Sequence, residues 1–170
     1  VHNLPIVFTV QNNQFAYSSP NEVEFGTPNV ADRGLGYGIE SKLIDGNDIY
    51  QVIDTMHDAC EKARSKGGPT LVELVTFRHY GHAGHDPAEY VEDEVREFWL
   101  KRDPILRFEE ALIEESLFTK TDFENLTEEL EKEIKNTIDW AKEQDDPDPQ
   151  EEIDDMFASR TTPVFQNDES

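Results

Sequence analysis

Two polar segments of the sequence contain the side chains best suited to chemistry. The first, Gln11 to Gln14, includes the pair Asn12-Asn13. Amide and backbone carbonyl oxygens are ligands that Mg²⁺ accepts, and a protein-bound Mg²⁺ commonly holds phosphate groups as well. Asn also tolerates left-handed backbone conformations and forms Asx turns, so an ordinary turn is the alternative. Taken alone, the residues of this segment favour the ordinary turn over a metal site.

The second segment runs from Arg78 to Pro87 and combines one Arg, three His and two Gly residues. A guanidinium and an imidazole can bind a phosphate, and Gly81 and Gly84 let the backbone approach it closely. Three histidines spaced by three also suggest zinc, but a helix would be needed to align them, and the glycines argue against one. For each histidine taken singly, a hydrogen-bonded loop residue is the alternative. The cluster therefore favours a phosphate site over a zinc site.

Both segments follow predicted β-strands. Apolar and β-branched residues form short runs at 6–10, 41–44 and 70–77, and the first run predicts a strand buried on both faces. Between the second and third runs, Asn47 is a suitable N-cap, and apolar positions from Ile49 to Ala63 repeat with helical spacing. Two strands joined by a helix through short connections predict a parallel crossover and an α/β fold. Ligands of such sheets bind beyond the carboxyl ends of the strands, where both polar segments lie.

The remaining predicted elements are helices. Asn29 should cap a short helix through Arg33, Asp103-Pro104 should begin another, and Thr121 with Glu124 matches a capping box. We therefore expect three regions: an α/β region over residues 1–90, a helical region over 91–157, and a tail or linker over 158–170.

Acidic residues outnumber basic ones, and the excess is concentrated in the second half of the chain. Residues 1–90 carry 12 Asp and Glu against 6 Lys and Arg, whereas residues 91–170 carry 26 against 9, for a total net charge of −23. Such a surface repels phosphate backbones and anionic lipids, so we expect neither nucleic acid nor a membrane as a partner. The single Cys60 excludes an internal disulfide, which fits a reducing cytosol. An apolar run close to a start without Met suggests a chain that begins inside a domain.

Five short blocks occur in one specific order along nearly the whole chain. They are Leu-Pro-Ile-Val-Phe with Asn-Asn-Gln-Phe-Ala, then Asp45 to Asp48, Gly68 to Glu73, Phe77 to Tyr90, and Asp103 to Ile105. In this order they resemble the alpha subunits of the thiamine-diphosphate-dependent 2-oxo acid dehydrogenases, a family that includes the pyruvate, branched-chain 2-oxo acid and acetoin dehydrogenases. The resemblance implies the C-terminal part of a thiamine-diphosphate-binding fold, a parallel sheet flanked by helices, followed by a helical C-terminal region.

The resemblance also implies roles for particular residues. Asn13 matches a Mg²⁺ ligand, and Phe15 matches the residue whose backbone carbonyl joins it, so both hold thiamine diphosphate through the metal. His82 matches a loop histidine that contacts the cofactor diphosphate and supports catalysis. Arg78 matches a further cofactor-site residue that orders this loop together with Asp86. The Gly-Asp-Gly that begins the cofactor motif is absent, so the chain alone is expected to bind the cofactor poorly and to be inactive.

By the same resemblance, the intact enzyme decarboxylates a 2-oxo acid on thiamine diphosphate and Mg²⁺ and passes the acyl unit to a lipoyl group. Its expected partners are a beta subunit, in an alpha2-beta2 heterotetramer, and a lipoyl acyltransferase core. The stretch with Ile153, Met156 and Phe157 resembles a segment that lies against neighbouring subunits. Ala83 stands where animal and plant members carry a regulatory phosphoserine, which favours a prokaryotic, cytoplasmic protein over one of the mitochondrial matrix.

Other interpretations stay open at the level of the sequence. The chain could be a non-catalytic acidic module whose helices from Asp103 onward bind a partner. It could also belong to another thiamine-diphosphate family, such as the transketolases, although the motif from Arg78 to His82 argues against this. A further variant is an alpha subunit fused to its beta subunit, with residues 161–170 as the connection.

Overall fold

A computed structural model describes residues 1–146 and 148–149 of the chain. In chain order, the elements are β1 (Val7–Asn12), β2 (Phe15–Ala16), β3 (Ser19–Pro20), α1 (Asn21–Glu24), α2 (Arg33–Tyr37), β4 (Glu40–Asp45), α3 (Ile49–Arg64), β5 (Thr70–Val75), α4 (Asp93–Leu100), α5 (Pro104–Glu114) and α6 (Lys120–Lys142). Residues Val1–Thr119 form one compact unit, and the described residues from Lys120 onward belong to a second. The predicted tail over 158–170 and the stretch with Ile153, Met156 and Phe157 lie outside the described residues.

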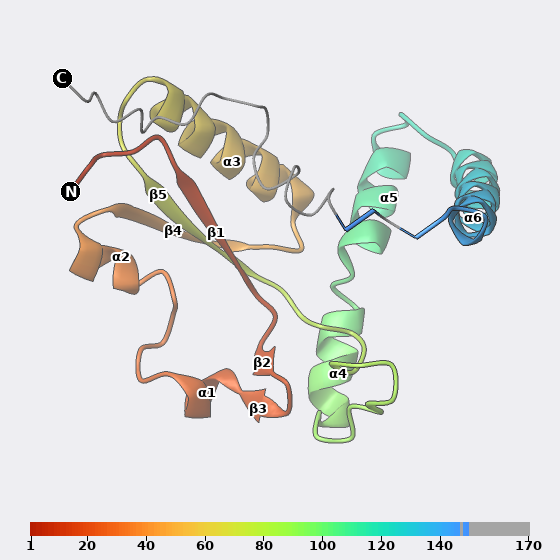
Figure 1. The fold of residues 1–170 in the computed structure, drawn as a ribbon, viewed down its shortest axis with the longest axis horizontal. Helices are drawn as coiled ribbons and strands as arrows, with labels where there is room; N and C mark the ends of the chain where they lie inside the picture. Colours follow the sequence, from red (N-terminus) through yellow and green to blue (C-terminus); the bar gives the residue numbers. More distant parts are fainter. Residues whose placement is uncertain (147, 150–170) are drawn as a thin grey trace. The chain divides into compact units, whose positions relative to one another are not determined.

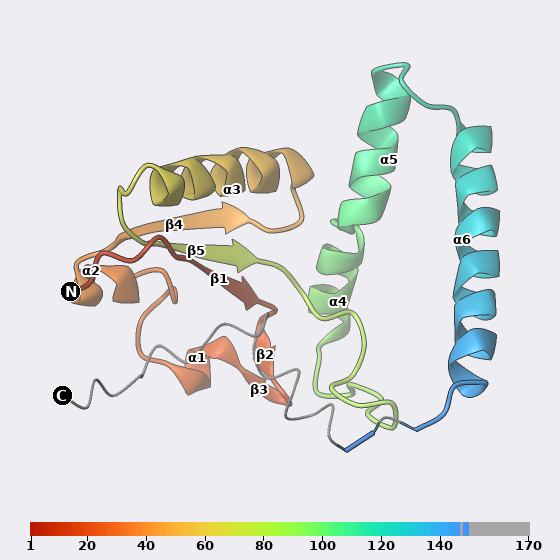
Figure 2. The ribbon, with the colours of Figure 1, turned by 45° about the horizontal axis from the view of Figure 1, so that its top comes forward.

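Three parallel strands form the sheet of the first unit. Their order is β1-β5-β4, so β5 is central and pairs in parallel with both neighbours. β4 and β5 are adjacent and are connected through α3, which confirms the predicted crossover and the α/β fold. The three strands point in one direction, toward the edge where the connections to β2 and α4 begin (Figures 1 and 2).

Helix α3 covers one face of this sheet and contacts all three strands (Figure 2). The helix begins after Asp48, whose Oδ1 accepts hydrogen bonds from the backbone N–H groups of Tyr50 at 3.1 Å and Gln51 at 3.2 Å. The prediction that Asn47 caps this helix is therefore wrong by one residue. The physical reason is that the Asn47 side chain is buried and bonded elsewhere.

A buried polar network around Asn47 joins the sheet to the start of α5. Asn47 is 2% exposed, and its side chain accepts a hydrogen bond from the Thr76 hydroxyl at 2.8 Å and donates to the Arg102 carbonyl at 2.9 Å. The guanidinium groups of Arg102 and Arg107 both pair with the carboxylate of Asp45, at 2.5 Å and 3.1 Å. The end of β4, the residue after β5 and the start of α5 are thereby held together at one edge of the sheet.

Two further local predictions are wrong. β1 is not buried on both faces, because Phe8 in its middle is 47% exposed. β1 lies at an edge of a three-stranded sheet, where neighbouring elements cover its side chains only in part. The short helix expected from Asn29 to Arg33 lies at Arg33–Tyr37 instead, because the Asn29 N–H donates to the Asp32 carboxylate in a preceding turn.

A small apolar cluster fixes the chain between β5 and α4. Its buried residues and those packed against them are Phe77, Ala88, Val91, Phe15, Tyr90, Val95 and Trp99. The rings of Phe77 and Trp99 stack with their centroids 5.7 Å apart. The Arg96 side chain, from α4, donates a hydrogen bond to the Ala88 carbonyl at 3.0 Å. The loop rich in Gly and His is thus anchored to a helix that the sequence analysis did not single out.

Capping explains where α5 begins, whereas α6 does not begin at its expected cap. α5 starts as predicted after Asp103, whose Oδ1 accepts hydrogen bonds from the N–H groups of Ile105 at 2.8 Å and Leu106 at 3.3 Å. α6 starts at Lys120, so Thr121 lies inside the helix and is not the expected cap.

Among the described residues, no helix is both long enough and apolar enough to cross a membrane.

Replacing Asn47 with Ala should lower the free energy of unfolding of the full chain by about 1–3 kcal/mol, because the Thr76 hydroxyl and the Arg102 carbonyl lose a buried partner. Urea denaturation followed by circular dichroism measures the change. Asn136→Ala, on the exposed surface of α6, is the matched control and should change stability by less than about 0.5 kcal/mol. Equal stability of the Asn47→Ala variant and the unaltered chain would contradict the structural role of this network.

Candidate functional site

The carboxyl ends of β1 and β5 bring the two polar segments together. The Thr76 N–H donates to the Asn12 carbonyl at 2.9 Å, and the Arg78 N–H donates to the Asn13 carbonyl at 3.3 Å. The parallel pairing therefore continues past the strands themselves. The Asn12-Asn13 turn and the loop from Arg78 to Pro87 start side by side, at the edge where α/β sheets bind ligands.

The side chain of Asn12 is engaged in holding the turn. Its Oδ1 accepts hydrogen bonds from the Gln14 N–H at 3.2 Å and from the Asn21 side-chain amide at 2.7 Å. Its Nδ2 donates to the carboxylate of Glu73 at 2.6 Å. The bond to Gln14 is that of an Asx turn, so the ordinary-turn interpretation describes Asn12 well.

Asn13 and Phe15 keep oxygen atoms available for a ligand. Within the described part of the chain, Asn13 Oδ1 accepts one long hydrogen bond, from the Phe15 N–H at 3.3 Å. Phe15 pairs with Pro20 across the β2–β3 hairpin, and proline has no N–H to donate to the Phe15 carbonyl. An amide oxygen and a carbonyl oxygen on one short turn are the hard ligands that Mg²⁺ prefers. The turn can therefore supply part of a magnesium site.

Two residues near Phe15, one directly before it and one two residues after it, adopt left-handed backbone conformations. The φ angle is 74° at Gln14 and 54° at Tyr17, a region that residues other than glycine rarely occupy. The Gln14 side chain donates to the Asn12 carbonyl at 3.0 Å, and its own carbonyl accepts from the Asn21 N–H at 3.1 Å. Such conformations persist where the surroundings fix them, and they gather at ligand sites.

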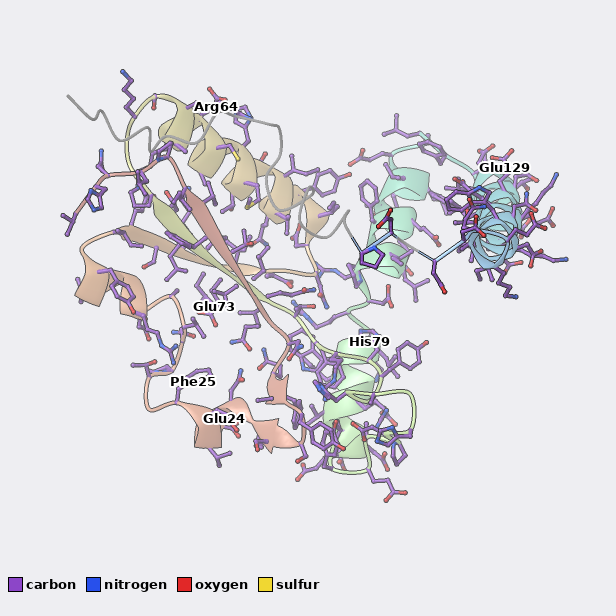
Figure 3. All side chains as sticks on the ribbon, in the orientation of Figure 1. Glu24, Phe25, Arg64, Glu73, His79 and Glu129 are labelled. Atoms are coloured by element: carbon purple, nitrogen blue, oxygen red, sulfur yellow. The ribbon has the colours of Figure 1, made fainter. Side chains whose placement is uncertain are left out.

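Glu73 lies beneath the turn and was missed by the sequence analysis as a site residue. Its side chain extends from the middle of β5, is 0% exposed, and lies on the side of the sheet that faces the segment carrying α1 and α2 (Figure 3). Oε1 accepts from the Asn12 side chain at 2.6 Å, and Oε2 accepts from the Ala31 N–H at 2.6 Å. The available signal was a lone carboxylate inside an otherwise apolar strand, Thr70–Val75.

Asp86 orders the backbone of the histidine loop. Its Oδ2 accepts hydrogen bonds from the His82 N–H at 2.7 Å and the Tyr90 hydroxyl at 2.8 Å, and its Oδ1 accepts from the Ala88 N–H at 2.9 Å. The backbone bonds from His82 and then Ala88 lower the pKa of Asp86 below its usual value, and Tyr90 and Arg78 act in the same direction. Burial, followed by the bond to Asp86, raises the pKa of the Tyr90 phenol.

Arg78 ties this loop to the Asn12-Asn13 turn. Its Nη2 donates to the Tyr17 carbonyl at 2.7 Å and to the Tyr90 hydroxyl at 2.7 Å, and its Nε donates to the Tyr80 carbonyl at 3.0 Å. None of these bonds uses Nη1, so the two N–H groups of Nη1 do not donate to Tyr17, Tyr80 or Tyr90. Arg78 thus orders the loop and keeps donors for an anionic ligand.

The histidine loop borders an open cavity of about 560 Å³. His82 is exposed there, and its ring meets the Tyr17 ring edge-to-face with centroids 5.0 Å apart. His79, labelled in Figure 3, also borders this cavity, but its Nδ1 lies 3.9 Å from the Asp103 carboxylate and its ring packs against Phe77. In the ranges that the structure describes, no three His, Cys, Asp or Glu side chains come together as metal ligands. The loop therefore suits an anion better than zinc.

Comparisons with known proteins point to one family. Residues 1–150 match the family model described as the dehydrogenase E1 component. The pyruvate dehydrogenase E1 component subunit alpha of Bacillus subtilis is 32% identical over 158 residues, which cover 92% of this chain and 42% of that protein.

Two further relatives come from the same organism. The alpha subunit of acetoin:2,6-dichlorophenolindophenol oxidoreductase is 31% identical over 160 residues, covering 94% of this chain and 47% of that protein. The 2-oxoisovalerate dehydrogenase subunit alpha is 30% identical over 159 residues, covering 93% and 48%. The chain thus spans less than half the length of each of these relatives.

Replacing Glu73 with Gln should lower the free energy of unfolding by about 1–3 kcal/mol, because the new amide N–H₂ would face one of two buried donors and leave it unpaired. Urea denaturation of the full chain measures the change. Glu89→Gln, at an exposed position two residues after the loop, makes the same chemical change without burial and should be close to neutral. If both variants are equally stable, the buried carboxylate does not hold the turn.

Replacing Asp86 with Asn should speed hydrogen exchange at the amides of His82 and Ala88, because a neutral amide cannot accept all three bonds that the carboxylate accepts. Hydrogen exchange measured by NMR reports each amide separately. Asp54→Asn, exposed on α3, is the control and should leave both amides unchanged.

The Asp86 carboxylate should also make the stability of the histidine loop depend on pH. Because the folded state lowers the pKa of Asp86, its contribution to loop stability is complete above the usual value of about 3.9 and is lost as the pH falls through the lowered value. Acidification below about pH 4 should therefore open the loop of the unaltered chain. The Asp86→Asn variant should lack this transition, and an identical acid profile in both chains would contradict the assignment.

Proposed function

Because the chain belongs to the dehydrogenase E1 component family, we propose that it is part of an alpha subunit that decarboxylates a 2-oxo acid on thiamine diphosphate and passes the acyl unit to a lipoyl group. The observation that carries the proposal is the pairing of the Asn12-Asn13 turn with the Arg78 loop at the carboxyl edge of the sheet. One segment offers oxygen ligands for a cation, and the other offers donors for an anion. A metal-bound diphosphate needs both.

The residues of the turn fit the metal of this cofactor. Asn13 Oδ1 and the Phe15 carbonyl would hold Mg²⁺, while Asn12 is held by Glu73 and Asn21 and would position them. Two protein oxygens are fewer than the six that Mg²⁺ requires. We infer that the remaining ligands come from the diphosphate, water and protein segments outside this chain.

The residues of the loop fit the charge of this cofactor. Arg78, through Nη1, and His82, through its imidazole, would donate hydrogen bonds to the diphosphate oxygens. His82 would also help to close the site against water, because its loop is fixed by Asp86 and lines the cavity beside it. The chemistry that thiamine diphosphate supplies when bound is a carbanion nucleophile and an electron sink for decarboxylation.

The assembly that we propose extends beyond this chain. It contains a lipoyl acyltransferase core and a beta subunit that completes the active site in an alpha2-beta2 heterotetramer. We propose that this assembly lies in the cytoplasm of a prokaryote. Its substrate is pyruvate or a branched-chain 2-oxo acid, as named for two of the relatives above; acetoin, named for the third, has no carboxyl group and does not fit the decarboxylation step. The alternative of a non-catalytic acidic module gains no support, since these relatives are enzyme subunits.

The test uses the chain in its assembled enzyme. Asn13→Ala should raise the dissociation constant for thiamine diphosphate with Mg²⁺ by at least roughly tenfold, because a metal ligand is lost. His82→Ala should weaken the binding of the cofactor and lower turnover, because the diphosphate loses a hydrogen-bond donor. Isothermal titration and steady-state kinetics measure the two effects.

His85→Ala is the matched control for this test. His85 is exposed on the same loop and should leave both cofactor affinity and turnover unchanged. Unaltered cofactor binding in the Asn13→Ala and His82→Ala enzymes would overturn the proposed site.

A further inference from the structure

Tyr17 contacts both halves of the candidate site. It follows Phe15 by two residues, and its carbonyl accepts a hydrogen bond from Arg78 at 2.7 Å. Its ring meets the His82 ring with centroids 5.0 Å apart and planes inclined at 67°. Tyr17 therefore reaches the histidine loop with its backbone and with its side chain.

The backbone of His82 and its imidazole are held by different residues. Asp86 accepts the His82 N–H at 2.7 Å and fixes the backbone. Within the described residues, the imidazole meets the Tyr17 ring edge-to-face, a geometry that aromatic pairs prefer. An exposed side chain on a loop otherwise exchanges between rotamers on a nanosecond timescale or faster. The Tyr17 ring thus restricts where the imidazole points.

The conformation of Tyr17 is fixed from several sides. Its φ of 54° is a strained value for a residue with a bulky side chain. The bond from Arg78 to its carbonyl, and a stacked contact with Tyr90 at 6.4 Å, hold it in place. The Arg78 N–H also donates to the Asn13 carbonyl at 3.3 Å. One residue, Arg78, therefore fixes both ends of the segment from Asn13 to Tyr17.

We propose that Tyr17 is a positioning residue for His82, and that it couples the geometry of the Asn13–Phe15 turn to the direction of the His82 imidazole. The expected effect of Tyr17 on catalysis rests on the proposed function, because Tyr17 can affect catalysis only if His82 contacts the cofactor. The contact itself depends only on this chain. The two ideas can therefore fail separately.

The first measurement is NMR on the full chain. We expect nuclear Overhauser effects between the ring protons of Tyr17 and His82, and a single populated χ1 rotamer of His82 from its three-bond couplings. Tyr17→Phe keeps the ring and should preserve the single rotamer. Tyr17→Leu removes the ring but keeps an apolar side chain, and its His82 couplings should become averaged, with His79 as an internal reference for an intact fold.

Several results would overturn this proposal. If the unaltered chain shows no nuclear Overhauser effects between the Tyr17 and His82 rings, the proposal is overturned. This result needs no variant, so it holds whether or not Tyr17→Leu folds. An unchanged His82 rotamer in Tyr17→Leu would also overturn the proposal, as would equal averaging in Tyr17→Phe. A confirmed contact in a chain whose enzyme binds no thiamine diphosphate would leave the positioning intact and overturn the proposed function instead.

The second measurement is kinetic and uses the assembled enzyme. Tyr17→Leu should lower kcat by roughly tenfold or more, since a misdirected catalytic group costs rate, while the KM for the 2-oxo acid stays within about twofold, because Tyr17 positions a group other than the substrate. Tyr17→Phe should retain the kcat of the unaltered enzyme. A loss of the same size in both variants, or a change confined to KM, would contradict the proposal.

Discussion

The carboxylate of Glu73 lies in the middle of the central strand without exposure to solvent, and burying such a group is costly unless its oxygens accept hydrogen bonds. The donors that satisfy it are the Asn12 side chain and the Ala31 N–H. Asn12 is the last residue of β1, where the turn begins, and Ala31 belongs to the irregular segment between α1 and α2. A single side chain on a rigid strand thereby sets the position of the turn and of that segment. Because the Asn12 Oδ1 accepts hydrogen bonds from Gln14 and Asn21, Asn13 is the member of the pair with the less occupied amide oxygen.

The histidine loop depends on the turn in a comparable manner. It has no regular secondary structure, yet Asp86 accepts three hydrogen bonds within it, and Arg78 connects it to Tyr17. Gly81 is required by this packing, because a Cβ at that position would overlap the Asp86 carbonyl. Gly84, in contrast, has open space around its Cα. The sequence suggested that Gly81 lets the backbone approach a bound phosphate. In the structure, the missing side chain of Gly81 instead makes room for the Asp86 carbonyl within the loop.

The start of α5 is held by a second set of polar contacts at the same edge of the sheet. Asn47 and Asp45 bind residues of the connection between α4 and α5, and the Arg107 guanidinium donates to the Asn47 carbonyl at 2.9 Å. These contacts involve neither the Asn13 oxygen nor the His82 imidazole. The Asp45-to-Asp48 block, which contributes to the family resemblance, is therefore explained by architecture, and it lies apart from the residues of the proposed cofactor site.

The sequence by itself determined the features that depend on neighbouring residues. Strand runs, helical periodicity and the Asp103-Pro104 start are local, so the parallel crossover, the α/β fold and the placement of two polar segments after strands were predictable. Tertiary structure alone decided the functions of individual side chains. Asn12 meets Glu73 across 61 positions, Arg78 meets Tyr17 across 61, and Asn47 meets Arg102 across 55. No local pattern encodes such contacts, because burial and hydrogen-bond partners are fixed only when distant segments pack. For that reason sequence patterns predicted Asn47 as a cap and assigned no role to Glu73 or Tyr17. Only the folded chain distinguished Asn12, whose side chain holds the turn through Glu73 and Asn21, from Asn13, whose Oδ1 accepts one hydrogen bond, from the Phe15 N–H.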